Sequence, residues 1–504
     1  MSEAVVEPPV FDRLDWSVNG LSQAFAHLSA RQVLSPAQRI ALIVGGAGSV
    51  VGFVLVPTVT AIAFMVFTTA AYLAVLVFRI NLLVRGRGDR HRFVVSDEAA
   101  LALTDDELPV ISILVPAYRE PEIVHKLVDH LLKLDYPTWK LDVRLLLEED
   151  DDETVNAATA LPLPAHVTVV LVPAADPRTK PKALNYGVLG AKGEIITIYD
   201  AEDDPDPLQL RRVIAAFQQC GPEVACIQAE LAYFNADENI ITRWFAIEYR
   251  MWFTQYLPGL AATDAPIPLG GTSNHFRRDV LVAMGAWDPW NVTEDADLGI
   301  RLYRQGFRVR LVASTTLEEA NVDFVNWVKQ RSRWYKGYLQ TWLVHLRRPR
   351  QLRRELGTRA FLRFNLFVGG TPLLALVNPI FWFLLLVWFA LEPQFIKDVM
   401  PTYVYYPSLV CWVVGNFAFY YLHVVTAFQF SQRKVFTAAL LTPVYWVMMS
   451  LAAAKAMVQM IVSPTFWEKT THGLSRVTAD GHDDHSPGGE IEPGHAVVET
   501  GGAR

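Results

Sequence analysis

Four long apolar runs stand out from an otherwise mixed pattern of hydrophobic and polar positions. They occupy residues 40–84, 364–391, 407–430 and 437–462. A helix needs about 20 apolar residues, at ~1.5 Å per residue, to cross a hydrocarbon core ~30 Å thick. The pattern therefore predicts membrane helices at both ends of a central segment, residues 85–345, whose mixed pattern is that of an ordinary globular domain.

The first apolar run is too long for one crossing. Pro57 lies near its middle, and a proline inside a helix removes a hydrogen bond and clashes with the preceding turn. We therefore expect two helices joined by a tight turn, which return the chain to the side of the membrane where it began.

The runs after the central segment differ in character. Residues 364–391 contain two glycines and two prolines, so we expect the first half to lie at the interface and the second half to cross. Residues 407–430 predict one crossing. In residues 437–462, Lys455 and Gln459 lie one helical turn apart on one face, which favours an amphipathic helix at the membrane surface.

The number of crossings follows from a parity argument. If residues 466–473 reach a site on the cytosolic side, the crossings must total an even number. Two before the central segment and two after it satisfy this condition, and five do not. Four crossings are the prediction, and five remain the alternative.

The central segment alternates short apolar strands with helical stretches. We expect strands at residues 110–115, 143–147, 167–172, 195–199 and 224–229 and helices at 123–133 and 208–218. Such alternation predicts a mostly parallel sheet covered by helices on both faces. Ligands of such sheets bind outside the carboxyl ends of the strands.

The chain accordingly divides into five parts by composition. They are a polar segment at residues 1–38, two transmembrane helices at 39–84, a cytosolic domain at 85–345, a second membrane region at 346–474 and a tail at 475–504. The tail is rich in Gly, Asp, Glu, Pro and His, which predicts disorder. Residues 1–38 show no pattern of a cleavable signal.

The net charge, the positions of basic residues and the cysteines indicate which classes of protein are excluded and on which side of the membrane the central domain lies. The net charge of −7 argues against general nucleic-acid binding. Basic residues cluster beside the apolar runs, at 85–92 and 347–350, which is the positive-inside pattern and predicts a cytosolic central domain. The three cysteines form no metal-ligand pattern and no disulfide framework, as expected in a reducing cytosol.

Acidic residues follow one of the predicted strands in a pattern that suits a metal. Asp200 and Glu202 come directly after residues 195–199. Two carboxylates at alternate positions of an extended loop point the same way, and a hard divalent cation prefers oxygen ligands. Such a cation stabilises a departing diphosphate. Asp203 is the alternative second ligand.

A second constellation lies further along the chain. Thr293, Glu294 and Asp295 precede Gln330-Arg331-Ser332-Arg333-Trp334 by about 35 residues. A carboxylate supplies a general base for deprotonating a hydroxyl. Arginine and amide groups donate to a diphosphate, and an aromatic ring offers a face on which a sugar stacks. On a helix, Gln330, Arg333 and Trp334 share one face.

These motifs together resemble membrane-embedded family 2 glycosyltransferases of the processive, cellulose-synthase-like kind. The resemblance covers roughly residues 40–473. It implies an α/β fold, that is, an A-type glycosyltransferase (Rossmann-like, mostly parallel sheet) domain inserted between transmembrane helices. It also implies an inverting transfer with Asp295 as general base, while Asp297 organises the helix start and His275 is structural.

The resemblance extends to the donor site. Tyr118, in Pro116-Ala117-Tyr118-Arg119-Glu120, is expected against the nucleotide base; Arg119 stands where the family usually has asparagine. Glu148 and Glu149 follow a strand where the family contacts uracil, with Glu148 in place of the usual Asp. Lys182 is expected near the diphosphate as a compact cation, close to a helix start.

Further positions are assigned by the same resemblance. Asp200 and Glu202 are expected to hold Mg²⁺ or Mn²⁺, Asp200 also contacting the nucleotide. The remaining substrate-binding positions are Thr293, Glu294, Gln330, Arg333 and Trp334. Residues 466–473 resemble the mobile gating segment of processive synthases.

The implied function is metal-dependent transfer from a nucleotide sugar, UDP-glucose first, to a growing β-linked polysaccharide that is exported across the membrane. The protein would be a multi-pass protein of the inner (plasma) membrane that contacts membrane lipids, its polysaccharide acceptor and accessory export subunits. The main alternative is transfer of a single sugar to a lipid carrier or other membrane acceptor. A non-catalytic scaffold or channel would have no use for Asp200, Glu202, Asp295 and Arg333 together.

Overall fold

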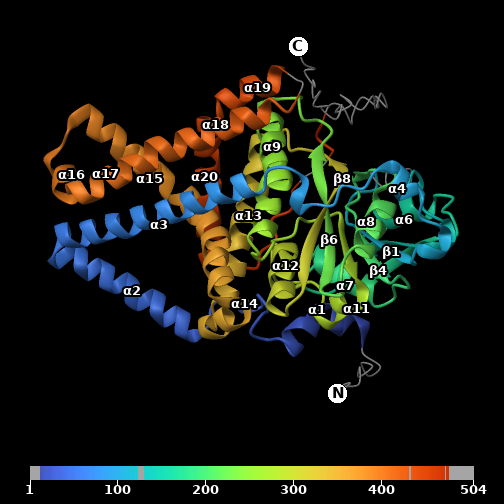
Figure 1. Ribbon diagram of the computed structural model, residues 1–504. Helices are drawn as coiled ribbons and strands as arrows, with labels where there is room; N and C mark the ends of the chain where they lie inside the picture. The colour runs from blue at the N-terminus through green and yellow to red at the C-terminus, as the bar shows by residue number, and fades with distance from the viewer. Residues whose placement is uncertain (1–11, 123–129, 431–432, 471–472, 476–504) are drawn as a thin grey trace, which may run out of the picture.

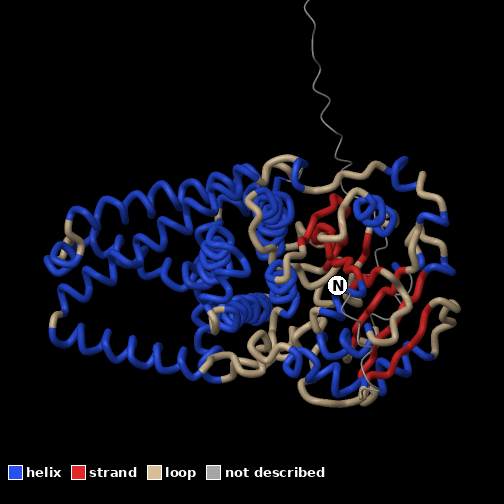
Figure 2. The backbone as a smooth tube through the Cα atoms, turned by 60° about the horizontal axis from the view of Figure 1, so that its bottom comes forward, coloured by secondary structure: helices blue, strands red, loops and turns tan. Residues whose placement is uncertain are grey.

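The chain builds an α/β domain beside a group of long helices that project from it to one side (Figure 1). The structure is a computed structural model and describes residues 12–122, 130–430, 433–470 and 473–475. Helices lie on both faces of the sheet (Figure 2). The predicted α/β fold class, with a mostly parallel sheet placed between apolar helices, is confirmed.

The sheet has eight strands in the order β3-β2-β1-β4-β7-β6-β8-β5. Their bounds are Ile111–Ala117 for β1, Leu141–Glu148 for β2, Val167–Val172 for β3, Ile195–Ile198 for β4, Asp204–Pro205 for β5, Val224–Tyr233 for β6, Asn274–Arg277 for β7 and Arg308–Glu318 for β8. All five predicted strands are present. The strands β7 and β8, and the short β5, were not predicted.

Pairing in the sheet brings the chemistry-bearing residues to one edge. Strands β3, β2, β1 and β4 are parallel, so their carboxyl ends lie together. Strand β7 runs antiparallel between β4 and β6, whereas β6 and β8 are parallel. Strands β1 and β2 are buried along nearly their whole length, as expected for parallel strands covered on both faces.

Helices of the α/β domain cover the sheet and lead into the site. Their bounds are Asp97–Leu101 for α4, Asp152–Thr159 for α6, Lys180–Val188 for α7, Gln209–Gln218 for α8, Ile240–Met251 for α9, Leu257–Ala262 for α10, Arg278–Ala283 for α11, Glu294–Arg304 for α12 and Phe324–His345 for α13. Short helical turns lie at Asp89–His91, Asp105–Glu107, Thr138–Lys140 and, as a π-helical turn, Trp252–Tyr256. Most of the predicted helix at residues 123–133 lies outside the described residues.

Five helices of the described chain are long and apolar enough to cross a membrane. The first two are α2, Pro36–Leu55, and α3, Pro57–Arg85, which confirms the predicted break at Pro57. The later ones are built from α14 (Pro349–Phe364), η5 (Asn365–Gly369) and α15 (Gly370–Leu391), from α17 (Thr402–Val410), η6 (Cys411–Gly415) and α18 (Asn416–Ala427), and from α20 (Thr442–Val462). Helices α16, Gln394–Val399, and α19, Arg433–Leu440, connect them.

Helix α20 runs across the direction of α3, α15 and α18 rather than along it (Figure 1). It packs against α13 of the α/β domain and against α15. Its polar residues Lys455 and Gln459 both bind Glu468 of the following segment, at 2.8 Å and 2.9 Å. Helix α20 is also one of the five helices long and apolar enough to span a membrane, so its position at the membrane surface stays a prediction.

The N-terminal segment, whose role the sequence does not reveal, lies against the α/β domain. Helix α1, Arg13–Ala24, packs on α7, and the Asn185 side chain donates to the backbone oxygen of Ser17 at 3.0 Å. The Asp288 carboxylate accepts hydrogen bonds from Ser29 and from the Ala30 backbone. The predicted disordered tail falls on residues 476–504, outside the described part.

Candidate active site

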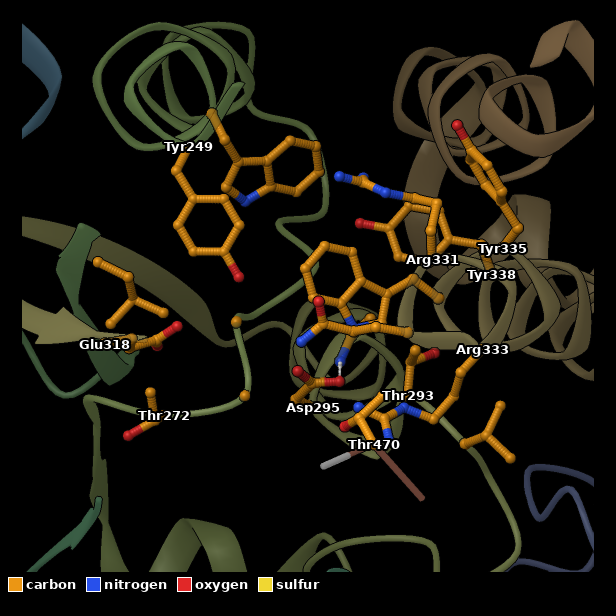
Figure 3. A pocket seen from close by; sticks show the side chains of 18 of the residues that line it. Tyr249, Thr272, Thr293, Asp295, Glu318, Arg331, Arg333, Tyr335, Tyr338 and Thr470 are labelled. Carbon is orange, nitrogen blue, oxygen red and sulfur yellow. Dashed lines mark hydrogen bonds between the residues drawn. The ribbon is translucent and has the colours of Figure 1, made fainter. Parts of the chain in front are cut away.

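A continuous cavity of about 710 Å³ lies between the carboxyl edge of the sheet and the apolar helices. Its floor is formed by the loops after β1 and β4 and by the start of α12, and one wall is α13. From there it extends between α3, α15, α18 and α20. Figure 3 shows Asp295, Thr293 and Arg333 at one end of this space and Tyr249 and Tyr335 at the other.

Asp295 lies in the first turn of α12 and lines the cavity. Its Oδ1 accepts a hydrogen bond from the Ala296 backbone at 2.7 Å. Burial raises the pKa of the Asp295 carboxyl. Burial, with the charge of the neighbouring Asp295, also raises the pKa of Glu294. A carboxylate with a raised pKa is a better proton acceptor at neutral pH than a solvated one.

Helix α13 approaches the loop before α12 very closely at Gly337. A Cβ atom on Gly337 would lie 2.3 Å from the Thr293 Oγ1 atom and 2.4 Å from its Cγ2 atom. Only a residue without a side chain allows this approach. It places Gln330, Arg333 and Trp334 of α13 along the same cavity as Asp295, so the structure brings the two predicted constellations together.

The acidic loop after β4 holds three carboxylates in different settings. Asp200 and Glu202 line the cavity. The Asp203 side chain is buried and accepts from the backbone of Asp200, at 2.8 Å, and from Thr272. Burial raises the pKa of Asp203 well above its usual range. Asp203 therefore closes the turn, and Glu202 is better placed than Asp203 to face a ligand.

The residues present fit a divalent cation that is completed by substrate. No group of three or more His, Cys, Asp or Glu side chains gathers at metal-binding distance within the described ranges. Magnesium is usually held by one or two carboxylates together with substrate phosphates rather than by an all-protein cage. Asp200 and Glu202, both facing the cavity, match that donor set.

Lys180, two positions before the predicted Lys182, is the cation of this site. Its ammonium group forms an ion pair with Asp200 and donates to the Gly271 backbone oxygen at 2.7 Å. Burial alone would lower the pKa of Lys180, but the carboxylates of Asp200 and Glu294 outweigh it and raise the pKa. Lys180 stays charged, in the cavity, where a diphosphate would need a counter-charge.

The structure does not support Lys182 as a diphosphate ligand. Its side chain is fully buried, and its ammonium group donates to Glu148 Oε2 at 2.7 Å and to the Pro173 oxygen at 3.0 Å. The pair fixes Glu148, which does line the cavity, at the end of β2. Glu149 points elsewhere: it accepts from the Ala174 backbone at 2.8 Å and is not among the residues that line the cavity.

The segment after α20 covers the part of the cavity that Tyr118 and Arg333 line. Arg333 donates to the Glu468 backbone oxygen at 3.2 Å and stacks over the Trp467 ring at 5.1 Å from its centre. Lys469 lies over the Tyr118 ring, 5.2 Å from its centre. The predicted gating-like segment therefore contacts both Tyr118 and α13; its residues 471–472 lie outside the described part.

Two predicted structural residues lie away from the cavity. Asp297 is buried between Arg301 and His345, 2.7 Å and 2.9 Å from their side-chain nitrogens, and ties α12 to α13. His275 is buried in β7, with its Nδ1 atom 2.8 Å from Thr197 Oγ1. Burial lowers the pKa of His275 to about 3, so it stays neutral.

An ion pair between Arg331 and Glu248, which the sequence analysis did not predict, packs against the Trp334 ring. The Arg331 guanidinium forms a fork with both carboxylate oxygens of Glu248 in α9. Tyr445 of α20 donates to Glu248 at 2.6 Å. The central carbon of the Arg331 guanidinium lies 4.7 Å from the centre of the Trp334 ring. The pair joins α9, α13 and α20 beside Trp334.

Comparison with known proteins agrees with this geometry. Residues 109–337 match the family described as "Glycosyltransferase like family 2". The chain is 26% identical over 254 residues to a probable glycosyltransferase, YdaM, of Bacillus subtilis, covering 49% of this chain and 60% of that protein. It is 29% identical over 257 residues to a beta-monoglucosyldiacylglycerol synthase of Trichormus variabilis, covering 50% and 53%. It is 23% identical over 366 residues to a probable glucomannan 4-beta-mannosyltransferase 3 of Arabidopsis thaliana, covering 71% and 65%.

The chain thus spans less than two thirds of the length of these curated relatives. The family match covers the whole segment from β1 to the middle of α13, which contains Asp200, Asp295 and Trp334. It confirms the predicted family and, with the order of the sheet, the predicted fold class. Residues 109–337 are a glycosyltransferase family 2 domain, carried by a chain with helices long and apolar enough to cross a membrane.

Proposed function

We propose that this protein transfers a hexose from a nucleotide sugar, UDP-glucose being the first donor to test, to a growing β-linked polysaccharide that then enters the membrane. The observation that carries the proposal is the continuous cavity. It contains Asp200 and Asp295 at one end and continues past Trp334 between membrane-type helices. A donor site and an exit for product are thus one continuous space.

In the proposed reaction, Asp295 accepts the proton of the acceptor hydroxyl. The hydroxyl oxygen attacks the anomeric carbon of the donor, and the bond from that carbon to the diphosphate oxygen breaks on the opposite face. The new bond therefore has inverted configuration. Lys180 and Arg333 balance the charge that develops on the diphosphate. Mg²⁺ or Mn²⁺ on Asp200 and Glu202 would supply further charge stabilisation.

The nucleotide end is proposed to hold the base between Tyr118 and Glu148. Both line the cavity, and the Lys182 pair holds Glu148 in place. The Lys469 ammonium over Tyr118 and the Trp467 ring beside Arg333 suit a segment that closes over the bound nucleotide. Thr293 and Glu294 lie beside the reacting centre, next to Asp295.

The acceptor end offers aromatic faces and polar side chains in alternation. Trp334 is half-buried, and its ring is backed by Phe245 and Arg331. Gln330 lies one turn earlier on α13 and is held by Asn321 at 2.9 Å. Aromatic stacking tolerates the sliding of a sugar chain better than a fixed hydrogen-bond network would. This supports a processive polymerase.

We further propose a multi-pass protein of the inner (plasma) membrane with a cytosolic catalytic domain and four crossings. The direction of α20 across α3, α15 and α18 supports four rather than five. The basic residues at 85–92 and 347–350 flank the domain side of the helices. Accessory export subunits stay a prediction from sequence.

Transfer of one sugar to a membrane lipid is the second candidate. Two observations favour it: one relative is named a beta-monoglucosyldiacylglycerol synthase, and the cavity reaches apolar helices that suit an acyl chain. The two functions differ in the product. A polymerase releases long chains from the first minutes, whereas a lipid transferase yields one sugar on one lipid.

The test is to incubate purified protein with a panel of UDP-sugars and to size the products. Wild type should make long products; Asp295→Asn should lower transfer at least ~10²–10⁴-fold while UDP binding stays near normal. Asp279→Asn, an exposed acid, is the matched control. Trp334→Ala should shorten the products. A single sugar on lipid, unaffected by Trp334→Ala, would select the second candidate.

A further inference from the structure

A cation without a counter-ion faces the membrane part of the cavity. Arg79 lies on α3, six positions before the helix ends at Arg85. Its Nη2 atom donates to Thr371 Oγ1 of α15 at 2.8 Å, and its guanidinium lies 5.9 Å from the centre of the Tyr256 ring. Throughout the described ranges Arg79 makes no ion pair, and its buried Nε atom has no hydrogen-bond partner.

The charge of Arg79, which has no ion-pair partner in the described residues, must be stabilised in some other way. A charged side chain within a membrane segment is costly and is found mainly where it faces a cavity and meets a partner. Glu248 also lines the cavity, but its two carboxylate oxygens already bind Arg331 and Tyr445. The wall around Arg79 therefore carries an excess of positive charge.

The surroundings of Arg79 suit a sugar rather than an acyl chain. Tyr72, Asn378, Asn416 and Thr371 line the same part of the cavity, beside aromatic rings. The Tyr72 hydroxyl is 3.4 Å from Asn378 Oδ1. Hydroxyl and amide groups at this depth are expensive to bury without a polar ligand or one another.

Arg79 also lies within electrostatic reach of the reacting centre. Burial raises the pKa of Tyr338 on α13; the Asp295 carboxylate acts in the same direction, whereas Arg79 lowers this pKa. Both charges therefore act on one side chain that lines the cavity.

We propose that Arg79 and Thr371 bind the carboxylate of an acidic sugar in the chain being extended. An arginine fork matches a carboxylate through two parallel hydrogen bonds and supplies the missing counter-charge. The inference rests on the proposed function and narrows its acceptor. The product would be an acidic polysaccharide, and uncharged glucose would not be its only unit.

The test compares two probes that differ only in charge. The full chain, in nanodiscs of phosphatidylcholine and with UDP present, is titrated with cellotetraose and with the same tetramer oxidised to carboxylates at C6. We expect wild type to bind the acidic tetramer about tenfold or more tightly than the neutral one, the gain of a charge-assisted hydrogen bond. The preference should decrease with salt.

Substitutions in α3 test whether the preference for the acidic tetramer depends on Arg79. Arg79→Gln should abolish the preference while leaving binding of the neutral tetramer and of UDP unchanged, and Arg79→Lys should keep part of it. Arg85→Gln, an exposed arginine on the same helix, is the matched control and should keep all of it. UDP binding also reports whether each variant is folded.

Three results would overturn the proposal. They are equal binding of both tetramers, a preference that survives Arg79→Gln, and Arg79-dependent binding of phosphatidylglycerol added to the nanodiscs in place of the acidic tetramer, which would make the ligand a lipid phosphate. The titration needs no turnover. Its result therefore stands apart from the polymerisation assay that tests the proposed function.

Discussion

The carboxylate of Asp295 is held in the first turn of α12, in a cavity where little solvent reaches it, and this setting decides how it titrates. Burial favours the neutral acid and so raises its pKa above the ~3.9 of a solvated aspartate. The charged form is nevertheless the form that accepts a proton.

The first prediction concerns pH. Because only the deprotonated carboxylate acts as a base, kcat/KM should decrease as pH falls through the raised pKa of Asp295, and the acid limb should lie above the range of an ordinary aspartate. A pH profile of kcat/KM, with protein stability followed at each pH, measures this. An acid limb at or below ~3.9, the value of a solvated aspartate, would contradict the buried setting.

The second prediction concerns metal. Asp200 and Glu202 face the cavity but do not form a closed cage, so a cation should bind weakly without substrate and should be removable. EDTA should stop transfer, and Mg²⁺ or Mn²⁺ should restore it. Asp200→Asn should raise the metal concentration needed for half-maximal activity. Transfer that survives exhaustive chelation would leave Lys180 and Arg333 as the sole partners of the leaving group.

At the scale of single residues, the sequence indicates which types of side chain the site needs. It does not indicate which of two neighbouring side chains of that type faces the cavity. Lys180 and Lys182 both stand at the start of α7, and side chains two positions apart on a helix point to different sides. Only the packing of α7 decides that Lys180 faces the cavity and that Lys182 is buried with Glu148. The choice between Glu202 and Asp203 depends in the same way on the turn that Asp203 closes.

At the scale of elements, the contact of α13 with the start of α12 aligns Asp295, the proposed base, with Gln330, Arg333 and Trp334. The third prediction is that Gly337→Ala lowers transfer by up to ~10²-fold, because the added Cβ meets Thr293 and displaces one helix from the other by a fraction of an ångström to an ångström. Steady-state transfer and UDP binding are measured together.

Gly48→Ala is the matched control for that variant, since it also places alanine in a helix but has open space around it. It should leave transfer unchanged. If Gly337→Ala keeps full activity, the close approach at Thr293 is not required for catalysis.

A strand could be predicted from the sequence where its own residues form a clear pattern. The runs that became β1 and β2 are continuously apolar because both of their faces are buried. Strand β7 has only four residues and is inserted antiparallel between β4 and β6, so its pairing depends on distant segments. Strand β8 mixes arginines with apolar positions, and its preference depends on context. For α20, the sequence indicated a polar face at Lys455 and Gln459. It did not indicate that Glu468 would bind both of these side chains.

On the scale of the whole molecule, the proposed topology with four crossings assigns each loop to one side of the membrane. The fourth prediction uses single cysteines in a chain whose three native cysteines are replaced by alanine. Thr58→Cys and Gln394→Cys, at the far ends of the helices, should react with a membrane-impermeant maleimide in intact cells. Asp106→Cys and Leu474→Cys should react only after permeabilisation.

The Leu474 position decides between four and five crossings, because it follows α20. Reaction of Leu474→Cys in intact cells would place the end of α20 outside. That result would separate the segment at 463–470 from Arg333 and Tyr118, which it contacts here.

The docking of the N-terminal segment on the α/β domain sets an order of events during translation. Arg347 donates to the Ser29 backbone oxygen across 318 positions of sequence, at 2.9 Å. At 5–20 residues per second, roughly tens of seconds separate the synthesis of these two residues. In the proposed topology, helices α2 and α3 therefore enter the bilayer before Arg347 is available to bind the segment that precedes them. The segment that contains Ser29 therefore reaches its final place only after Arg347 has been made.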